Sequence, residues 1–252
     1  MPRCSRWIAG LVVPLVMATG CSSGGRDDDA SSSTTDRSTT TTTEATTTTA
    51  ELTGQPLVVT EQGLSTFPDV VDPLEDLGGY GVIVQNPDPA LMATGVRVIT
   101  RVLDPTGKEL LVDSALLNGI LPGQRMAVGR TLIEPIDNPT TLDVKIEVTA
   151  WLPPASPDGT LVAENVVTEP EAAGGSVTRF TIRSSWPDRE DGVDVTAVYR
   201  AEDGRILGAE STSVDVPIES PVDGRIRLLS PIPDLAHTEV FVGRGFAALT
   251  TG

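Results

Sequence analysis

Residues 96–110 are VRVITRVLDPTGKEL, and this stretch decides the fold. Its apolar face is carried by Val96, Val98, Thr100 and Val102, which alternate with mostly polar or charged neighbours. Side chains of a strand point alternately to the two faces of a sheet, so a period of two predicts a strand with one buried face. The run ends at Asp104-Pro105-Thr106-Gly107, where glycine supplies a positive φ without a steric penalty. The stretch therefore predicts an antiparallel hairpin.

The same alternation recurs along the chain. It is seen at Val144, Ile146 and Val148, at Val193, Val195, Ala197 and Tyr199, and at Ile226 and Leu228. Turn sequences such as Leu121-Pro122-Gly123 and Glu202-Asp203-Gly204 separate these runs. No apolar stripe at helical spacing is found after Gly54, and the best exception is Val70 to Leu77 (VVDPLEDL), for which we expect a short helical turn.

An internal repeat divides the part of the chain after Gly54 into two. The matching segments, in order, are Val58–Glu61 and Val166–Glu169, Gly78-Gly79 and Gly174-Gly175, Asn86-Pro87-Asp88 and Trp186-Pro187-Asp188, Gly95–Val98 and Gly192–Val195, Gly107-Lys108 and Gly204-Arg205, and Pro135-Ile136 and Pro231-Ile232. After the first pair the offset stays at 96 to 100 residues, which indicates a duplication. We expect an all-β fold with two tandem immunoglobulin-like antiparallel β-sandwich domains, at 54–157 and 158–252.

The first repeat resembles a known group of modules. Residues 96–110, followed by Leu121-Pro122-Gly123, are similar to the FxLYD-type β-sandwich modules of bacterial surface lipoproteins. Thr100, Leu103 and Asp104 stand where that signature has Phe, Tyr and Asp. The resemblance implies a small adhesive or spacer module without a shared catalytic site.

The beginning of the chain has the pattern of an export signal. Arg3 and Arg6 precede the apolar run Ile8 to Ala18, which is too short for the roughly 20 residues of a membrane span. Residues 18–21, Ala-Thr-Gly-Cys, resemble the lipobox of bacterial prolipoproteins. The resemblance implies cleavage after residue 20 and lipidation of Cys21, and so a palmitate-type anchor in the cell membrane. The alternative is an ordinary signal peptide that happens to end in cysteine.

Residues 21–53 form a Ser/Thr-rich linker, with fifteen Ser or Thr among residues 31–50. Such a stretch buries too little apolar surface to fold, so we expect a disordered tether. Its root-mean-square span is roughly 30 Å, from about 5–6 Å times the square root of the residue number. Composition leaves open whether the threonine runs are O-glycosylated or unmodified.

Charge and cysteine content restrict the function. The formal net charge is −17, and loss of Arg3 and Arg6 with the signal makes it −19. Such an acidic chain has no electrostatic attraction to nucleic acid or anionic lipid. Cys4 lies in the signal, so Cys21 is the one cysteine after cleavage, and no disulfide is expected. The low lysine content indicates a GC-rich genome and, with the tether, a lipoprotein of actinobacterial type.

Catalytic motifs are scarce. His237 is the one histidine, and no Gly-x-Ser-x-Gly elbow accompanies it. Carboxylates are abundant but concentrate at turns, where solvation explains them. Residues 188–191, Asp-Arg-Glu-Asp, lack the ligand spacing of a calcium loop. We expect no enzyme activity, no cofactor and no metal, and a hydrolase using His237 or a carboxylate pair is the least favoured alternative.

Two tryptophans are candidate contacts for a ligand or partner. Trp151 ends a predicted strand, and Trp186 precedes Pro187. An exposed indole stacks on a sugar ring or anchors a protein interface, whereas a buried one belongs to the core. The sequence therefore predicts a secreted, lipid-anchored scaffolding or binding protein on the outer face of the cytoplasmic membrane, facing the wall and contacting an envelope protein. The alternative is a carbohydrate- or solute-binding lipoprotein.

Overall fold

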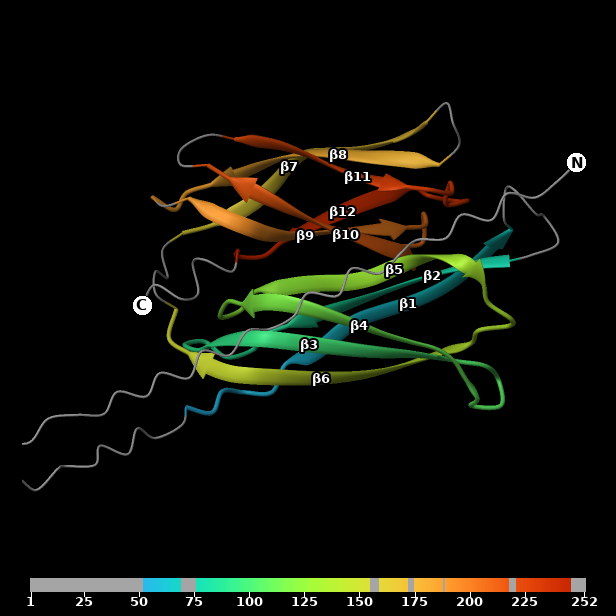
Figure 1. Ribbon diagram of the computed structural model, residues 1–252, viewed down its shortest axis with the longest axis horizontal. Coiled ribbons are helices and arrows are strands. Elements are labelled where there is room, and N and C mark those ends of the chain that lie inside the picture. The colour runs from blue at the N-terminus through green and yellow to red at the C-terminus, as the bar shows by residue number, and fades with distance from the viewer. Residues whose placement is uncertain are drawn as a thin grey trace, which may run out of the picture. The chain divides into compact units, whose positions relative to one another are not determined.

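The computed structural model describes residues 52–68, 76–154, 159–171, 175–187, 189–217 and 221–245. These ranges form twelve antiparallel β-strands and no helix, which confirms the all-β prediction (Figure 1). The chain divides into two compact units, 1–48 and 49–252, and every described residue belongs to the second. The predicted signal, Cys21 and the predicted tether up to residue 51 lie outside the described ranges.

The first sandwich consists of two three-stranded sheets. Sheet A has the order β1-β2-β5, with β1 at Val58–Pro68, β2 at Asp76–Gln85 and β5 at Arg125–Pro135. Sheet B has the order β4-β3-β6, with β4 at Glu109–Ile120, β3 at Met92–Leu103 and β6 at Thr141–Leu152. The helical turn expected at residues 70–77 is not formed at its end, because Asp76 and Leu77 already belong to β2. Residues 70–75 lie outside the described ranges.

The second sandwich repeats this topology strand for strand. Sheet C has the order β11-β8-β7, with β11 at Val222–Leu228, β8 at Ser176–Ser184 and β7 at Leu161–Pro170. Sheet D has the order β10-β9-β12, with β10 at Ile206–Val216, β9 at Glu190–Arg200 and β12 at His237–Val242. Strands β1 to β6 thus correspond to β7 to β12, and the predicted pair of tandem immunoglobulin-like sandwiches is confirmed.

The predicted alternation places the core. Val96, Val98, Thr100 and Val102 of β3 are buried, whereas Arg97 and Arg101 between them are exposed. The equivalent positions of β9, Val193, Val195, Ala197 and Tyr199, are buried in the second sandwich. The hairpin turns are also as expected, with Gly107 at φ 82° and Gly204 at φ 84°.

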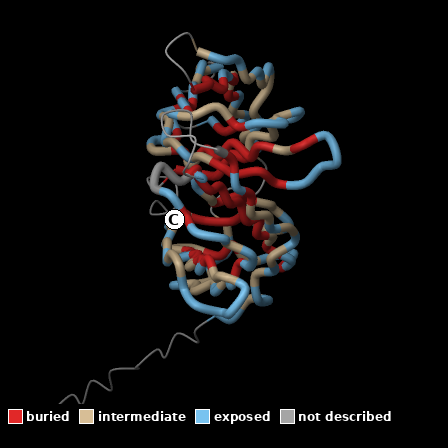
Figure 2. The backbone as a smooth tube through the Cα atoms, turned by 90° about the vertical axis from the view of Figure 1, so that its right-hand side faces the viewer, coloured by how far each residue is buried: buried red, intermediate tan, exposed pale blue. Residues whose placement is uncertain are grey.

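The two sandwiches share a third core, which the sequence did not indicate. Sheet A packs face to face against sheet D, so the four sheets stack in the order B, A, D, C (Figure 1). The shared core consists of Ile83, Ala127, Val198, Ile206, Ala209 and Phe241, all nearly inaccessible. Strands β2 and β9 are therefore buried on both faces, and buried backbone runs through the middle of the body (Figure 2).

Glycines in sheet A allow this close approach. A Cβ on Gly129 would lie 2.7 Å from the Cβ of Ala209, and one on Gly81 would lie 2.8 Å from Ile206. A Cβ on Gly79 would lie 2.5 Å from the carbonyl oxygen of Leu207. Because real Cβ contacts are not this short, any side chain at these positions would force sheets A and D apart.

Polar contacts fix the register between the sandwiches. Gln124 Nε2 donates to the Val242 carbonyl at 3.0 Å, and the Ser65 hydroxyl donates to the Leu207 carbonyl. The Arg200 guanidinium lies 2.8 Å from Glu61. These directional contacts and the shared core make residues 52–245 one body as far as they are described.

Candidate functional site

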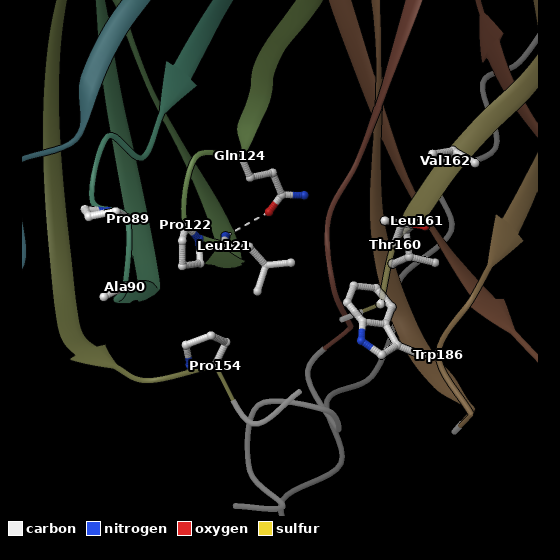
Figure 3. A pocket seen from close by; sticks show the side chains of 11 residues that line it. Pro89, Ala90, Leu121, Pro122, Gln124, Pro154, Thr160, Leu161, Val162 and Trp186 are labelled. Carbon is white, nitrogen blue, oxygen red and sulfur yellow. Dashed lines mark hydrogen bonds between the residues drawn. The ribbon is translucent and has the colours of Figure 1, made fainter. Parts of the chain in front are cut away.

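A cavity of about 690 Å³ lies at the seam between the two sandwiches (Figure 3). The first sandwich lines it with Pro89 and Ala90 between β2 and β3, with Leu121, Pro122 and Gln124 between β4 and β5, and with Pro154 after β6. The second lines it with residues 159–162 at the beginning of β7 and with Trp186 after β8. The site exists only because the sandwiches are docked.

Two side chains hold the loops of the first sandwich in place. The Asn86 amide donates to the carbonyls of Leu91 and Ile120 at 2.8 and 2.9 Å, which ties the β2–β3 loop to the end of β4. The Asp88 carboxylate accepts from the backbone N–H groups of Ala90, Leu91 and Gln55. These bonds stabilise the ionised carboxylate and lower the pKa of Asp88 below its ordinary value. This wall of the cavity is therefore preformed.

Trp186 forms part of the opposite wall, but its ring is fixed by its surroundings. It is 4% exposed, and the Arg244 guanidinium lies over the ring at 4.3 Å from its centroid. The backbone of Gly159 lies so close that a Cβ there would be 1.8 Å from Trp186 Nε1. Arg244 is in turn bound to buried Glu190 at 2.7 Å. The indole therefore belongs both to the packing of the second sandwich and to the cavity wall.

The polar groups of the lining are already paired. Gln124 Oε1 accepts from the Leu121 N–H at 2.8 Å, while its Nε2 bonds to Val242. The Thr160 hydroxyl is paired with Ser185 Oγ at 3.2 Å. Among the described lining residues none is ionisable. The cavity thus offers apolar contact and few hydrogen bonds to a ligand.

The structure separates the two tryptophans. Trp151 is half-buried, packs against the core of the first sandwich and does not line the cavity. The backbone of Gly54 lies on its ring, where a Cβ would be 2.2 Å from Cε3. Of the two candidate contacts, Trp186 is the one that the fold brings to the cavity.

The groups weighed for catalysis are not assembled among the described residues. His237 is exposed at the beginning of β12, and its side chain has no hydrogen bond or ion pair within the described ranges. Glu190 pairs with Arg244, and Asp191 pairs with Arg189, while Asp188 lies outside the described part. No group of three His, Cys, Asp or Glu side chains is placed to hold a metal ion within those ranges. The described residues also contain no helix long and apolar enough to span a membrane.

The repeat itself contains a signal for the cavity. Asn86-Pro87-Asp88 and Trp186-Pro187-Asp188 are equivalent segments of sequence. The first directly precedes the lining residue Pro89, and Trp186 of the second lies in the opposite wall. The Glu190–Arg244 pair had no such signal, because the two residues are 54 positions apart.

The comparisons with known proteins assign no family to the chain. No protein-family model matches the sequence, and no curated protein matches it significantly. The FxLYD-type resemblance therefore stays a prediction.

Proposed function

We propose that the chain is a lipid-anchored, non-enzymatic binding or scaffolding protein of the bacterial cell envelope. The observation that carries the proposal is the third core, which joins the two sandwiches into one body instead of two modules on a flexible connection. A rigid body with preformed surfaces loses little conformational freedom on association, which favours binding.

The anchor and tether set the location. Cys21 would carry the lipid, and two or three acyl chains are enough for stable membrane attachment. The net charge of −19 after signal removal keeps the folded part away from anionic headgroups, and the tether spans roughly 30 Å. The body would therefore stand on the outer face of the cytoplasmic membrane, within reach of wall-associated proteins.

The test is photo-crosslinking in living cells. A photo-reactive residue replaces Leu116 on sheet B or, in a second variant, Arg225 on sheet C, because both are exposed. We expect a reproducible envelope protein in the crosslinked product from the anchored chain. In a Cys21→Ala background the protein should leave the membrane fraction and lose that product. Absence of any product from both sheets across several growth conditions would contradict the proposal.

A second candidate function is solute binding in the seam cavity, which its volume and preformed walls favour. Within it, a carbohydrate is the less favoured ligand, because Trp186 presents little open ring and the polar lining groups are paired. Trp151→Phe leaves Trp186 as the one tryptophan of the mature chain. If wall polysaccharides change the emission of that variant, a sugar ligand regains support.

A further inference from the structure

The lining of the seam cavity defines the chemistry of its ligand. Proline, aliphatic and aromatic side chains make up most of the wall, as at Pro122, Leu161 and Trp186. The polar side chains, Gln124 and Thr160, are bonded to the protein itself. A ligand rich in hydroxyl or charged groups would lose its hydrogen bonds to water without replacement there. The volume of about 690 Å³ lies within the range of small-molecule sites.

The cavity lies at the end of the body where the described chain begins. Gln55, three residues after the first described residue, donates its backbone N–H to Asp88 at 2.9 Å. Asp88 immediately precedes Pro89 and Ala90 of the lining. Gly54 packs on Trp151, three residues before the lining residue Pro154. The described chain therefore begins beside the cavity, so a tether from Cys21 would join the body at this end.

From these two observations we infer that the seam cavity binds the acyl chain of a lipid from the adjacent membrane leaflet. The inference rests on the proposed anchoring at Cys21, because the predicted flexible tether of roughly 30 Å lets the cavity reach the leaflet although the net charge disfavours lasting contact with anionic headgroups. The acyl chain lies against the prolines, Leu161 and Trp186, and the headgroup stays outside, because the described lining has no charged partner for it.

The test uses the mature chain, which begins at residue 21, with Cys21→Ala, so that the protein carries no acyl chain of its own. It also carries Trp151→Phe, so that Trp186 is its one tryptophan. The probe is cis-parinaric acid, a long-chain polyene fatty acid that accepts energy from tryptophan. We expect saturable quenching of Trp186 with sensitised probe emission. Unchanged Trp186 emission would overturn the inference.

Two valines on β7 provide a matched pair of variants. Val162 and Val167 are 44% and 49% exposed, and Val162 is the one that lines the cavity. Val162→Glu should weaken probe binding about tenfold, because it removes one aliphatic contact that the bound probe would bury. Val167→Glu should leave binding unchanged, and since both side chains are exposed neither change should unfold the protein. Equal weakening by both variants would contradict the site.

The source of the chain is decided by lipid extraction. Anchored protein purified from cells should release noncovalently bound membrane lipid on extraction with organic solvent, while its covalent anchor stays attached, and the anchored Val162→Glu variant should release less. Equal amounts of lipid from the two anchored proteins, or no lipid from either, would overturn the assignment to a membrane lipid. The photo-crosslinks from Leu116 and Arg225 do not depend on the cavity, so the anchored Val162→Glu variant should still crosslink the envelope partner. Lost lipid binding with retained crosslinking concerns the inference alone, whereas lost crosslinking concerns the proposed function.

Discussion

The backbone N–H of Asn118, on β4 of the first sandwich, donates to Asp194 Oδ2, on β9 of the second, at 3.0 Å. β4 is an edge strand of sheet B, so this N–H has no partner within its own sheet. Burial at the seam raises the pKa of Asp194 above its ordinary value, although the hydrogen bonds from Asn118 act in the opposite direction. The contact thus combines a useful acceptor with a costly buried charge.

Asp194→Asn should stabilise the protein at neutral pH, because it keeps an oxygen acceptor and removes the charge. The folded-state pKa is raised, so the wild-type side chain favours folding at acidic pH, and this contribution is lost as the pH rises from the unfolded pKa through the folded one. The urea midpoint of Asp194→Asn should therefore exceed that of wild type at pH 7, and the gain should vanish below about pH 4.

Asp194→Ala is the control for the acceptor. It leaves the Asn118 N–H unpaired and should cost about 1–3 kcal/mol at pH 7. If Asn and Ala at this position have the same effect on the midpoint, the hydrogen bond across the seam contributes nothing to stability.

Gly129→Val should separate the sandwiches. Its side chain would meet Ala209 and the carbonyl oxygen of Tyr80, and overpacking of a filled interface costs about 1–3 kcal/mol. We expect faster hydrogen exchange of the amides in β2, β9 and β10. Gly107→Ala is the control, because Gly107 has a φ of 82° and nothing within 4 Å of an added Cβ. It should cost about 1–2 kcal/mol from backbone strain alone and leave exchange at the seam unchanged.

The parts of the fold that followed from sequence were local ones. Alternation at Val96 to Val102 and the glycine turns at 107 and 204 predict strands and hairpins because side-chain direction and φ are decided within a few residues. The duplication predicts two similar sandwiches. The packing of sheet A on sheet D depends on residues far apart in sequence, such as Gly129 and Ala209. The sequence around a glycine or alanine in a strand does not indicate which residue packs against it.

A comparison of the repeats explains why the stack contains two sandwiches. Val198 pairs with Ala209 on the face of sheet D that sheet A covers, whereas the equivalent pair on sheet B is Arg101 with Val112. Arg101 lies near Glu109 and Asp143 and is exposed. The outer face of sheet C carries further ion pairs, such as Arg179 with Glu169. The charged side chains on both outer faces disfavour the packing of a further sheet on either side of the stack.

The cavity was predictable in part. Trp186 is a candidate contact in the sequence because an exposed indole can stack on a sugar ring or anchor an interface, and the structure places it in the wall. Trp151 had the same sequence features but packs on the core of its own sandwich. Only the docking of the domains distinguishes them, because the lining comes from both.

Asp113→Ala should expose the edge of sheet B to self-association. The Asp113 carboxylate accepts from the edge N–H of Ser114 at 2.8 Å and from the Tyr80 hydroxyl at 2.7 Å. Val112 and Leu116 lie on the same strand and are 48% and 64% exposed. Removal of the carboxylate frees an N–H beside these apolar side chains, a combination that favours pairing of edge strands. Sedimentation velocity should detect concentration-dependent dimers.

The matched control for that prediction is Asp143→Ala on β6, the other edge strand of sheet B. Asp143 is exposed and contacts Arg101 at 3.9 Å, so its loss should leave the protein in the association state of wild type. Dimers of both variants in equal amount would point to reduced net charge and not to the freed edge.

The Glu190–Arg244 pair should be strongly coupled in unfolding experiments. Both side chains are nearly inaccessible, and Glu190 Oε2, Arg244 Nε and Arg244 Nη1 have no hydrogen-bond partner among the residues that the structure describes. Arg244→Met leaves the Glu190 carboxylate buried without its cation, and breaking such a pair from one side costs about 3–5 kcal/mol. Exchange of both residues, Glu190→Leu with Arg244→Met, should recover most of that loss, because two apolar side chains need no partners. A double-mutant cycle in urea measures the coupling. Since Arg244 stacks on Trp186, both variants should also change tryptophan emission in the folded state. If the losses of stability from Arg244→Met alone and from Glu190→Leu alone add up to the loss in the double variant, the pair does not stabilise this wall of the cavity.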